Sequence, residues 1–220
     1  MEWFDIKNYK NVILLDHPLI KHKITQLRKI ETSTHKFRPL VKELSVIEGY
    51  EALKNVKTRK VEITTPIETT VQEEVHTKDL CFVPILRAGL GMADGLLELV
   101  PGAVCGHIGL YRDEITHEPV EYYCKLPEDI GEKDVYLVDP MLATGGSAID
   151  AVKMLRAHGA KKMTFICIIA APEGVKAFSE ANPDIPLYIG ALDRCLNEDA
   201  YICPGLGDCG DRIFGTVGKK

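Results

Sequence analysis

The chain has 220 residues, of which 45% are hydrophobic and 27% are charged, as in ordinary globular proteins. This length allows one large core or at most two small domains, and we expect residues 1–220 to form a single domain. The net charge of −5 argues against a broad surface for nucleic acid or for an anionic membrane, although it leaves room for a local basic pocket.

The sequence contains no pattern typical of a secretory signal or of a membrane span. The first residues lack a basic segment followed by an apolar one, and no apolar run approaches the roughly 20 residues that a membrane-spanning helix needs. The seven cysteines form no CxxC pair, which favours free thiols in a reducing compartment. We therefore expect a cytoplasmic protein without a metal site built from cysteines.

The first third of the chain alternates between helical and extended patterns. Residues 1–15 form an N-terminal extension that ends in a short apolar run, and Pro18 suits the first turn of a helix. In chain order, the patterns predict a strand or anchoring segment at 12–15, a helix from 18 to about 30, a helix from 34 to about 47, and a half-exposed strand at 60–67.

The rest of the chain predicts a parallel α/β fold. Residues 80–86 and 163–170 are continuously apolar, as strands buried on both faces of a parallel sheet are. Further strands are predicted at 103–110, 135–138 and 187–192, helices at 89–99, 147–158 and from 172, and an antiparallel hairpin or arm at 120–124. Strands that alternate with helices in this way form a doubly wound sheet, and ligands bind beyond the carboxyl ends of its strands.

The segment 135–147 predicts a phosphate site. An apolar strand ends in Asp139, and a short loop then reaches Thr144-Gly145-Gly146-Ser147, where an amphipathic helix begins. Paired glycines let backbone N–H groups approach an anion, and the helix N-terminus adds further donors. Asp139 beside a phosphate suggests a sugar phosphate, because ribose hydroxyls or a bridging Mg²⁺ would offset the repulsion; a turn or helix-capping aspartate is the alternative.

Two arginines and a glycine-rich tail complete the candidate site. Arg87 and Arg112 each follow a predicted strand, and a guanidinium group suits phosphate oxygens, although surface ion pairs would also explain them. The tail 201–212 contains four glycines and one proline. The residues that flank it, 201–202 and 212–214, resemble anchors and favour an ordered loop over a flexible turn, and the backbone of such a loop could recognise a flat heterocycle. A cluster at Arg28-Lys29 could bind an anion, with a solvated helix end as the alternative.

The chain resembles the uracil phosphoribosyltransferase family over nearly its whole length, from residue 16 to residue 216. The segments that carry this resemblance are 84–92, 106–112, 120–123, 139–147 and 204–208. The resemblance implies the type I phosphoribosyltransferase fold, with a parallel sheet core flanked by helices, a small hood and a β-arm. Residues 200–216 would form the base-binding loop of that hood. It also implies transfer of the phosphoribosyl group of 5-phosphoribosyl 1-pyrophosphate (PRPP) to uracil, which gives UMP and pyrophosphate in pyrimidine salvage.

The resemblance also implies the residues of the site. Asp139 would hold the ribose hydroxyls, and 143–147 would wrap the 5′-phosphate. Arg112, Asp139 and Asp208 would be catalytic, and Asp208 would meet Mg²⁺, directly or through water. The implied PRPP site consists of Arg87, Arg112, Asp139, Pro140, Met141, Leu142, Ala143, Thr144, Gly145, Gly146, Ser147 and Asp208. The implied uracil site consists of Ile202, Gly207, Asp208 and Cys209.

Some positions depart from the wider superfamily. Pro140 and Ala143 stand where acidic residues are common, as they also do in the uracil branch, and their presence removes a side-chain candidate for the general base. Uracil N1 would then lose its proton to solvent, to Asp208 or to a phosphate oxygen. Cys209 stands where the family usually has Ala, and it could crowd the base pocket or add a reactive thiol.

Other functions and assemblies stay open at this point. One alternative is a nucleotide-sensing, RNA-binding pyrimidine regulator on the same fold, and another is a phosphoribosyltransferase for a different base. The net charge of −5 counts against the RNA-binding alternative. The resemblance implies a homodimer or homotetramer, and it allows allosteric regulation by GTP.

Overall fold

The fold is built on a central sheet that is parallel except at one edge. The computed structural model describes residues 4–112 and 119–216. The main sheet has the strand order β1 (Val12–Leu14), β11 (Leu187–Leu192), β10 (Lys162–Ala170), β8 (Asp134–Val138), β4 (Leu80–Leu86), β6 (His107–Arg112) and β7 (Pro119–Lys125). Only β6 and β7 pair antiparallel within it. Short strands β5 (Val104–Cys105) and β9 (Met141–Leu142) pair with β4 and β10.

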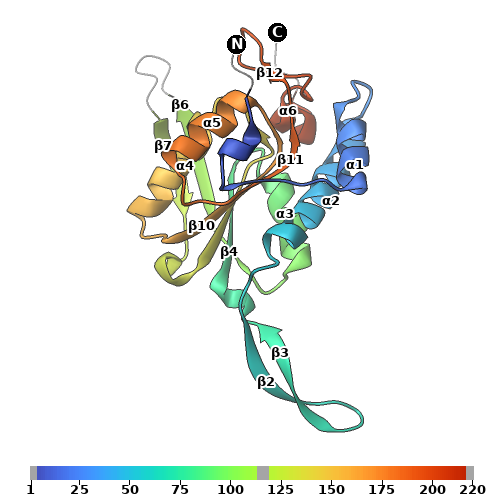
Figure 1. Ribbon diagram of the computed structural model, residues 1–220, viewed down its shortest axis with the longest axis vertical. Helices are drawn as coiled ribbons and strands as arrows, with labels where there is room; N and C mark the ends of the chain where they lie inside the picture. The colour runs from blue at the N-terminus through green and yellow to red at the C-terminus, as the bar shows by residue number, and fades with distance from the viewer. Residues whose placement is uncertain (1–3, 113–118, 217–220) are drawn as a thin grey trace.

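Helices cover both faces of the sheet (Figure 1). One face carries α1 (Pro18–Arg28), α2 (Thr34–Ala52), α3 (Leu90–Leu99) and α6 (Cys209–Phe214). The other carries α4 (Gly146–Ala157) and α5 (Pro172–Ala181). Single turns of 3-10 helix lie at Ile6–Asn8, Thr77–Asp79 and Ile130–Glu132.

The apolar strands serve two cores because successive side chains point to opposite faces. Phe82 of β4 and Ile166 of β10 pack with α1, α2 and α3. Their neighbours Val83 and Phe165 pack with α4 and α5. The parallel α/β fold with helices on both faces is therefore confirmed, and its physical cause is the continuous apolar character of the central strands.

The protruding arm lies elsewhere than the sequence suggested. Residues 120–124 belong to β7, which forms the predicted antiparallel hairpin with β6 but remains at the edge of the main sheet. The arm is the two-stranded ribbon of β2 (Thr58–Thr64) and β3 (Thr69–Val75), which projects from the body in Figure 1. β3 was not predicted, because its residues are mostly polar and exposed and no apolar alternation marks it.

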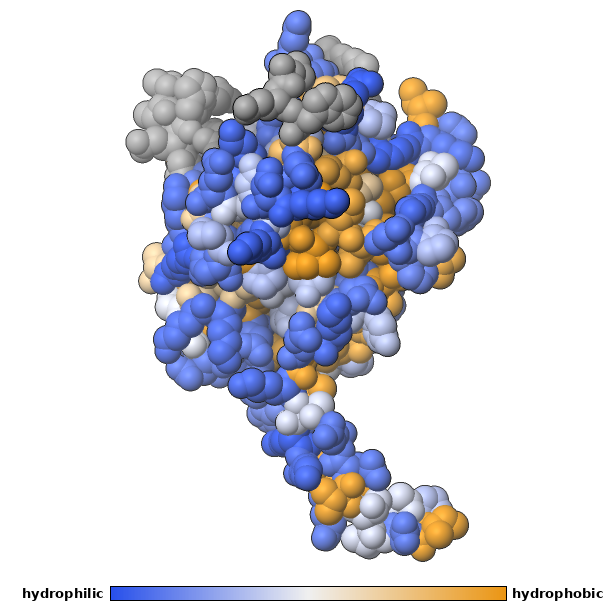
Figure 2. Space-filling model, in the orientation of Figure 1, coloured by the Kyte–Doolittle hydropathy of each residue, from blue (hydrophilic) through white to orange (hydrophobic). Residues whose placement is uncertain are grey.

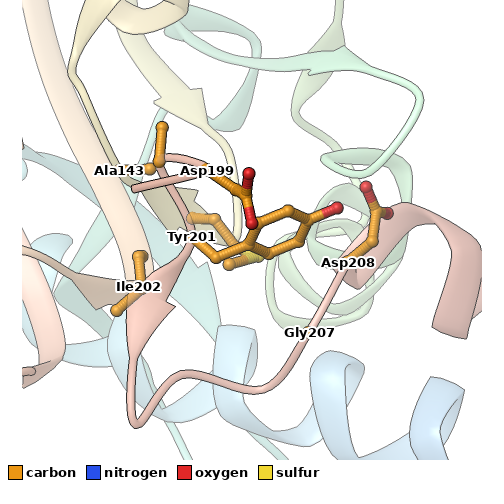
Figure 3. Close-up of a pocket in the computed structure, with 8 residues that line it drawn as sticks. Ala143, Asp199, Tyr201, Ile202, Gly207 and Asp208 are labelled. Atoms are coloured by element: carbon orange, nitrogen blue, oxygen red, sulfur yellow. The ribbon is translucent and has the colours of Figure 1, made fainter. Parts of the chain in front are cut away.

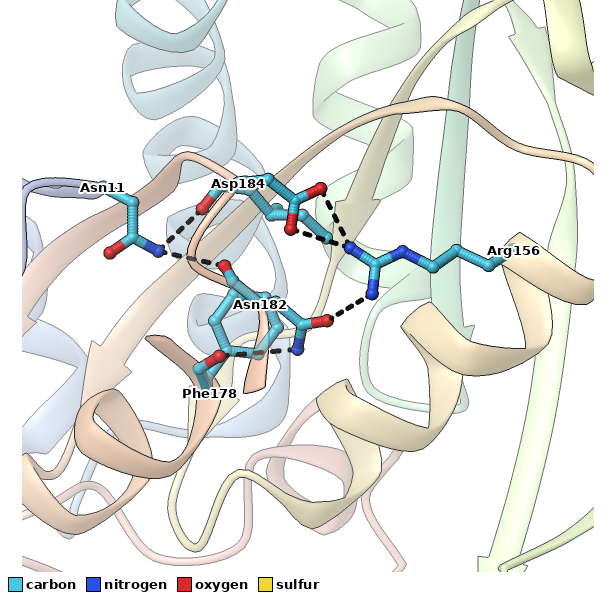
Figure 4. A network of polar contacts seen from close by, with 6 residues as sticks. Asn11, Arg156, Phe178, Asn182 and Asp184 are labelled. Carbon is cyan, nitrogen blue, oxygen red and sulfur yellow. Dashed lines mark hydrogen bonds and ion pairs between the residues drawn. The ribbon is translucent and has the colours of Figure 1, made fainter. Parts of the chain in front are cut away.

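A polar network holds the N-terminal segment at the edge of the sheet (Figure 4). Arg156 of α4 donates to Asn182 Oδ1 at 3.1 Å and to both carboxylate oxygens of Asp184, at 2.8 and 2.9 Å. Asn11 donates from Nδ2 to the carbonyls of Asn182 and Ile185, at 3.3 and 2.9 Å. These contacts hold Asn11, which directly precedes β1. Because β1 pairs in parallel with β11, the segment predicted as a strand or an anchor is a strand of the sheet. In the described ranges, no helix is long and apolar enough to cross a membrane.

Glu48 of α2 is a buried carboxyl inside this fold. Its side chain is fully buried, and neither carboxyl oxygen has a hydrogen-bond partner among the described residues. It lies against Gly190 of β11, where an added Cβ would come within 2.2 Å of Oε1. Burial raises the pKa of Glu48 well above its ordinary value of 4.5, so the folded protein favours the neutral acid.

We predict that Glu48 makes the protein less stable as pH rises. Because its folded pKa is raised, the stabilising effect is complete below the unfolded pKa and is lost as pH rises toward the folded pKa. The free energy of unfolding should then fall by up to about 1.4 kcal/mol per pH unit across that window. Glu48→Gln should make this slope shallower in urea unfolding measured between pH 5 and pH 8, and should leave the part that Asp139 contributes.

The control for this prediction is Glu43→Gln on the same helix. Glu43 is half exposed and pairs with Lys23 at 2.5 Å, and an exposed pair contributes at most about 1 kcal/mol. The Glu43 variant should therefore keep the wild-type slope. An unchanged slope in the Glu48 variant would contradict the argument.

Candidate active site

Two loops are held together at the carboxyl edge of the sheet. Residues 87–89 follow β4 and residues 139–145 follow β8, and these two strands pair in parallel as far as Pro84 and Val138. A Cβ on Gly89 would lie 2.5 Å from the Val138 carbonyl oxygen, so only glycine allows this approach. The loop after β6 begins at Arg112, whose side chain lies outside the described residues, as do residues 113–118.

The loop from β8 ends in an open helix N-terminus. Gly145 is the N-cap of α4, with φ of 88°, and no side chain caps this helix. This left-handed conformation strongly favours glycine, and an added Cβ would also lie 3.1 Å from the Gly174 carbonyl oxygen. Thr144 Oγ1 accepts a long hydrogen bond of 3.5 Å from the Gly146 amide. The first turn of α4 therefore presents backbone donors suited to an anion.

Asp139 lies directly after β8 and is half-buried. Its Oδ1 accepts a hydrogen bond from the Met141 amide at 3.3 Å. Burial is the main cause that raises the pKa of Asp139 to about 7; the Met141 amide opposes this shift and the nearby Asp208 carboxylate adds to it. Hydroxyl donors or a cation from a ligand would stabilise the ionised form of this carboxyl, which the free protein disfavours.

The C-terminal segment forms a hood beside these loops. Its short strands β12 (Cys195–Leu196) and β13 (Ile202–Cys203) pair antiparallel, and a loop then leads to α6. Asp208 is the N-cap of α6, with its Oδ1 accepting from the Asp211 amide at 2.8 Å. The Arg87 guanidinium lies 4.0 Å from Asp211 Oδ1 and 5.5 Å from the centroid of the Phe214 ring. The loop after β4 thus meets the hood.

A cavity of about 290 Å³ joins the β8 loop to the hood. It is lined by Met141, Ala143, Asp199, Ala200, Tyr201, Ile202, Gly207 and Asp208. In Figure 3 the Tyr201 ring lies between the side chains of Asp199 and Asp208. Residues far apart in the chain therefore share one cavity, which brings the predicted phosphate loop and the predicted base loop together.

Asp199 was not predicted to line the site. Tyr201 lies in the segment 200–216 predicted to bind the base, but its half-exposed side chain was not predicted to line the cavity. The available signal for Tyr201 was its position as an aromatic residue beside a glycine-rich segment. Asp199 had no signal, because its position depends on how the hood folds back over the sheet edge.

A partly buried ion pair between Arg28 and Asp193 fixes the hood loop, and no pattern in the sequence predicted it. Arg28 of α1 pairs with both carboxylate oxygens of Asp193, which is almost fully buried. The same guanidinium donates to the Gly205 carbonyl at 2.8 Å, and the Gly205 amide donates to Asp193 Oδ2 at 2.9 Å. Arg28 is therefore engaged inside the protein, whereas its neighbour Lys29 is the exposed C-cap of α1, as a solvated helix end would be.

Arg212 of α6 ties the hood loop to the end of α1. Its guanidinium donates to the carbonyls of Leu27, Leu206 and Lys29 at 2.6 to 2.7 Å. It also stacks over the Phe37 ring, 4.4 Å from the centroid. The loop 203–208 is thus ordered by two arginines, which confirms the prediction of an ordered tail.

Cys209 is a buried thiol. It is the first residue of α6, is 2% exposed and packs in the core beneath the hood. Burial raises the pKa of its thiol well above the ordinary value, and the nearby Asp139 and Asp208 carboxylates add to that shift. The expectation that this thiol could react was therefore wrong.

Comparison with known proteins agrees with this geometry. The family model described as uracil phosphoribosyltransferase matches residues 13–216. A uracil phosphoribosyltransferase from Agathobacter rectalis is 58% identical over 205 residues, which cover 93% of this chain and 98% of that protein. The solved structure of the AQ2163 protein from Aquifex aeolicus is 40% identical, with a TM-score of 0.89 over 94% of this chain and 100% of that one.

More distant solved structures share the fold alone. A hypoxanthine phosphoribosyltransferase from Staphylococcus aureus is 16% identical, with a TM-score of 0.50 over 82% of this chain and 84% of that one. The predicted phosphoribosyltransferase fold is therefore confirmed. Together with the match over residues 13–216, these findings show that the chain belongs to the uracil phosphoribosyltransferase family.

Proposed function

We propose that the protein transfers the phosphoribosyl group of PRPP to uracil and releases UMP and pyrophosphate. The observation that carries the proposal is the cavity in which the β8 loop meets the hood loop. A sugar phosphate and a flat base must lie side by side for this transfer, and these two loops offer suitable donors to each. Family membership supports the same reaction.

Asp139 and the loop after it would bind the phosphoribosyl group. The carboxyl of Asp139 would accept hydrogen bonds from the ribose hydroxyls. The backbone of 143–147 would surround the 5′-phosphate, aided by the N-terminus of α4, which has no side-chain cap among the described residues. Holding both ends of the sugar would fix the reacting carbon relative to the base, which is how binding energy accelerates a two-substrate reaction.

Arg87 and Arg112 would stabilise the departing pyrophosphate. Negative charge grows on this group as the sugar becomes cation-like in the transition state, and positioned cations lower the energy of such charge. The Arg87 side chain is 58% exposed and lies at the edge of the hood, where it can reach a ligand. Among the described residues, its guanidinium contacts Asp211 at 4.0 Å and the ring of Phe214, and neither contact uses its donors in a short hydrogen bond.

The acidic residues also fit Mg²⁺. This ion prefers oxygen ligands and usually binds through one or two carboxylates, several waters and the phosphates of a substrate. Asp208 has one oxygen engaged by the Asp211 amide, which leaves the other for the ion or for its water. When bound, Mg²⁺ would supply charge neutralisation for the pyrophosphate.

The hood would bind uracil, chiefly through its backbone. Ile202 is buried at the cavity wall, and Gly207 has φ of 79°, so the loop exposes peptide groups without a side chain at that point. The buried side chain of Cys209 leaves a backbone contact as its means of meeting the base. The acceptor for the uracil N1 proton stays open among solvent, Asp208 and a phosphate oxygen.

The direct test incubates the protein with the magnesium salt of PRPP and one base at a time. UMP formation with uracil, and no nucleotide with orotate or purine bases, is the expected result. Product from a purine or orotate alone would transfer the assignment to another base. Salt-sensitive RNA binding without UMP formation would support the regulator instead.

We further propose that the protein forms a homodimer or homotetramer through the β2–β3 arm. The arm projects from the body, and apolar residues remain exposed on it among polar ones (Figure 2). Ile67 is 91% exposed, Val71 56% and Ile63 40%. Isolated two-stranded ribbons are marginally stable in water, so contact with a second copy would stabilise this one.

We expect Ile67→Glu to weaken self-association about 10-fold or more, because a charge would then have to be buried at an apolar contact. Sedimentation velocity over a concentration series would measure the change. Gln72→Glu, on the same ribbon and also exposed, should leave association within about twofold of wild type. Equal association of all three proteins would exclude the arm as the interface.

We propose two further features that the sequence suggests: a cytoplasmic location and regulation by GTP. All seven cysteines are free, which supports a reducing, cytoplasmic location. Allosteric regulation by GTP rests on the family resemblance alone, because Arg28 is already committed to Asp193. Adding GTP to the UMP assay would test it.

A further inference from the structure

Three side chains of metal-ligand type meet on the surface, at the end of α4 opposite its phosphate-binding terminus. Glu121 and Cys124 belong to β7, and His158 is the C-cap of α4. A carboxylate oxygen, the thiol sulfur and an imidazole nitrogen all lie within 4.8 Å of one another. The 12 residues of α4 separate this cluster from the proposed phosphate site by about 18 Å.

A β-bulge places the two β7 residues on one face. Residues three apart on a regular strand point to opposite faces, so Glu121 and Cys124 would normally diverge. Here the pairing shifts between Gly109 and Leu110, and Tyr122 is the extra residue of β7. The β6 residues paired with Glu121 and Cys124 both belong to the core on the α4 side. The bulge thus aims both side chains at His158, as bulges commonly do near functional sites.

The orientation of His158 is that of a metal ligand. Its Nδ1 lies 2.9 Å from the Met154 carbonyl oxygen. A carbonyl only accepts, so Nδ1 carries the proton and the lone pair of Nε2 faces Cys124. Metal-binding histidines typically donate their second nitrogen to such a carbonyl. The sequence offered no ligand spacing here, because 34 positions separate Cys124 from His158.

The distance between the two softer ligands also fits a tetrahedral ion. Cys124 Sγ lies 3.7 Å from His158 Nε2. Ordinary Zn–S and Zn–N bonds at a tetrahedral angle place sulfur and nitrogen about 3.6 Å apart. Glu121 and His158 are exposed and Cys124 is half-buried, so water can reach the fourth position. The C-terminal end of a helix dipole also favours a cation at this place.

We propose that Glu121, Cys124 and His158 form a site for a divalent transition metal of the Zn²⁺ type, with water as the fourth ligand. Thiolate, imidazole and carboxylate together select Zn²⁺ over Mg²⁺ or Ca²⁺, which prefer oxygen ligands. The ion would join the edge strand of the β6–β7 hairpin to the end of α4. It would therefore act on the position of that hairpin and not on the reacting groups.

Binding requires one proton to leave Cys124. The ligand is the thiolate and not the thiol, so the thiol proton has to be released when the ion binds. The step is Cys–SH plus M²⁺ giving Cys–S–M⁺ plus H⁺, with no change in oxidation state. Affinity should consequently rise with pH.

The test titrates Co²⁺, as a coloured substitute for Zn²⁺, into the full chain after treatment with a chelator and a reductant. The expected result is a thiolate-to-cobalt charge-transfer band that saturates at one ion per chain and disappears when Zn²⁺ is added. Cys124→Ser should abolish the band. His158→Gln and Glu121→Gln should each weaken Co²⁺ binding at least about 10-fold.

The matched control is Cys105→Ser. Cys105 Sγ also lies near an imidazole, 3.9 Å from His107 Nε2, but no described carboxylate completes a ligand group there. This variant should keep the full band. No band in the wild type, or one that survives in the Cys124 variant, would overturn the proposal and leave a thiol–imidazole hydrogen bond.

A second readout separates this site from the proposed reaction. Zn²⁺ should raise the melting temperature of the wild type and of Cys105→Ser, but not that of Cys124→Ser. UMP formation with Mg²⁺ alone should be the same for the wild type and Cys124→Ser. If the wild type formed no UMP, the proposed function would be refuted, but the evidence for the metal site would be unaffected.

Discussion

Replacing Asp139 with Asn should nearly abolish UMP formation while making the ligand-free protein more stable at alkaline pH. The variant would lack the carboxylate that is proposed to accept hydrogen bonds from the ribose hydroxyls. We therefore expect kcat/KM to fall on the order of 10²–10³-fold, as for comparable groups that stabilise a transition state. In the same variant, a half-buried charge beside Asp208 disappears. Function and stability therefore oppose each other at this residue.

The sign of the stability effect follows from the raised pKa. The ordinary value of 3.8 becomes about 7 in the folded protein, so stability is complete below the unfolded value and is lost as pH rises through about 7. At pH 8 the Asn variant should exceed the wild type by on the order of 2–4 kcal/mol in unfolding free energy. The difference should shrink toward pH 4.

These effects are measured as initial rates of UMP formation and as urea unfolding at pH 5 and pH 8. Asp134→Asn is the control, because Asp134 lies at the opposite end of β8 and pairs with Lys162 at 3.2 Å on the surface. It should change neither quantity appreciably. A wild-type rate in the Asp139 variant would remove this residue from the reaction.

Breaking the pair between Arg28 and Asp193 is expected to have the largest structural effect. Asp193→Ala leaves the Arg28 guanidinium without its carboxylate and the Gly205 amide without its acceptor. Removing one partner of a buried pair costs about 3–5 kcal/mol. Because Gly205 belongs to the loop proposed to bind uracil, KM for uracil should rise about 10-fold or more, with a smaller change in KM for PRPP.

Two further variants distinguish positioning from simple destabilisation. Asp193→Asn keeps an oxygen for the Gly205 amide but removes the charge, so it should recover part of the uracil affinity. Asp184→Asn breaks the exposed pair with Arg156, which should cost at most about 1 kcal/mol and leave both KM values unchanged. Equal increases in both KM values for Asp193→Ala would contradict a specific role in placing the base loop.

The sequence was most informative where local chemistry decided the structure. Strands at 80–86 and 187–192 were predicted with the bounds that the structure has, because continuous apolar runs end abruptly at polar or turn residues. The helix after Gly145 was predicted to within a residue. By contrast, β3 was missed because its residues are polar, and α6 because it is only six residues long and contains Gly210.

In the candidate site, too, the features set by consecutive residues were predicted, and those set by distant contacts were not. The loop from Asp139 to Ser147 was predicted because strand, glycines and helix N-terminus are consecutive in the chain. Cys209 was misjudged because its exposure depends on how α6 packs, and Arg28 because its partner Asp193 is 165 positions away. No local pattern encodes a contact over that distance.

By itself, the amino-acid sequence determined the parallel α/β fold, the order of its elements, the phosphate loop and the family. These follow from apolar periodicity and from short motifs, in which each interaction lies within a few residues. Only the tertiary structure decided that β2 and β3 form the projecting arm, that Arg28 and Arg212 order the hood, and that burial brings the pKa of Asp139 to about 7. Each of these depends on groups that folding brings together from distant parts of the chain, and on the water that their packing excludes.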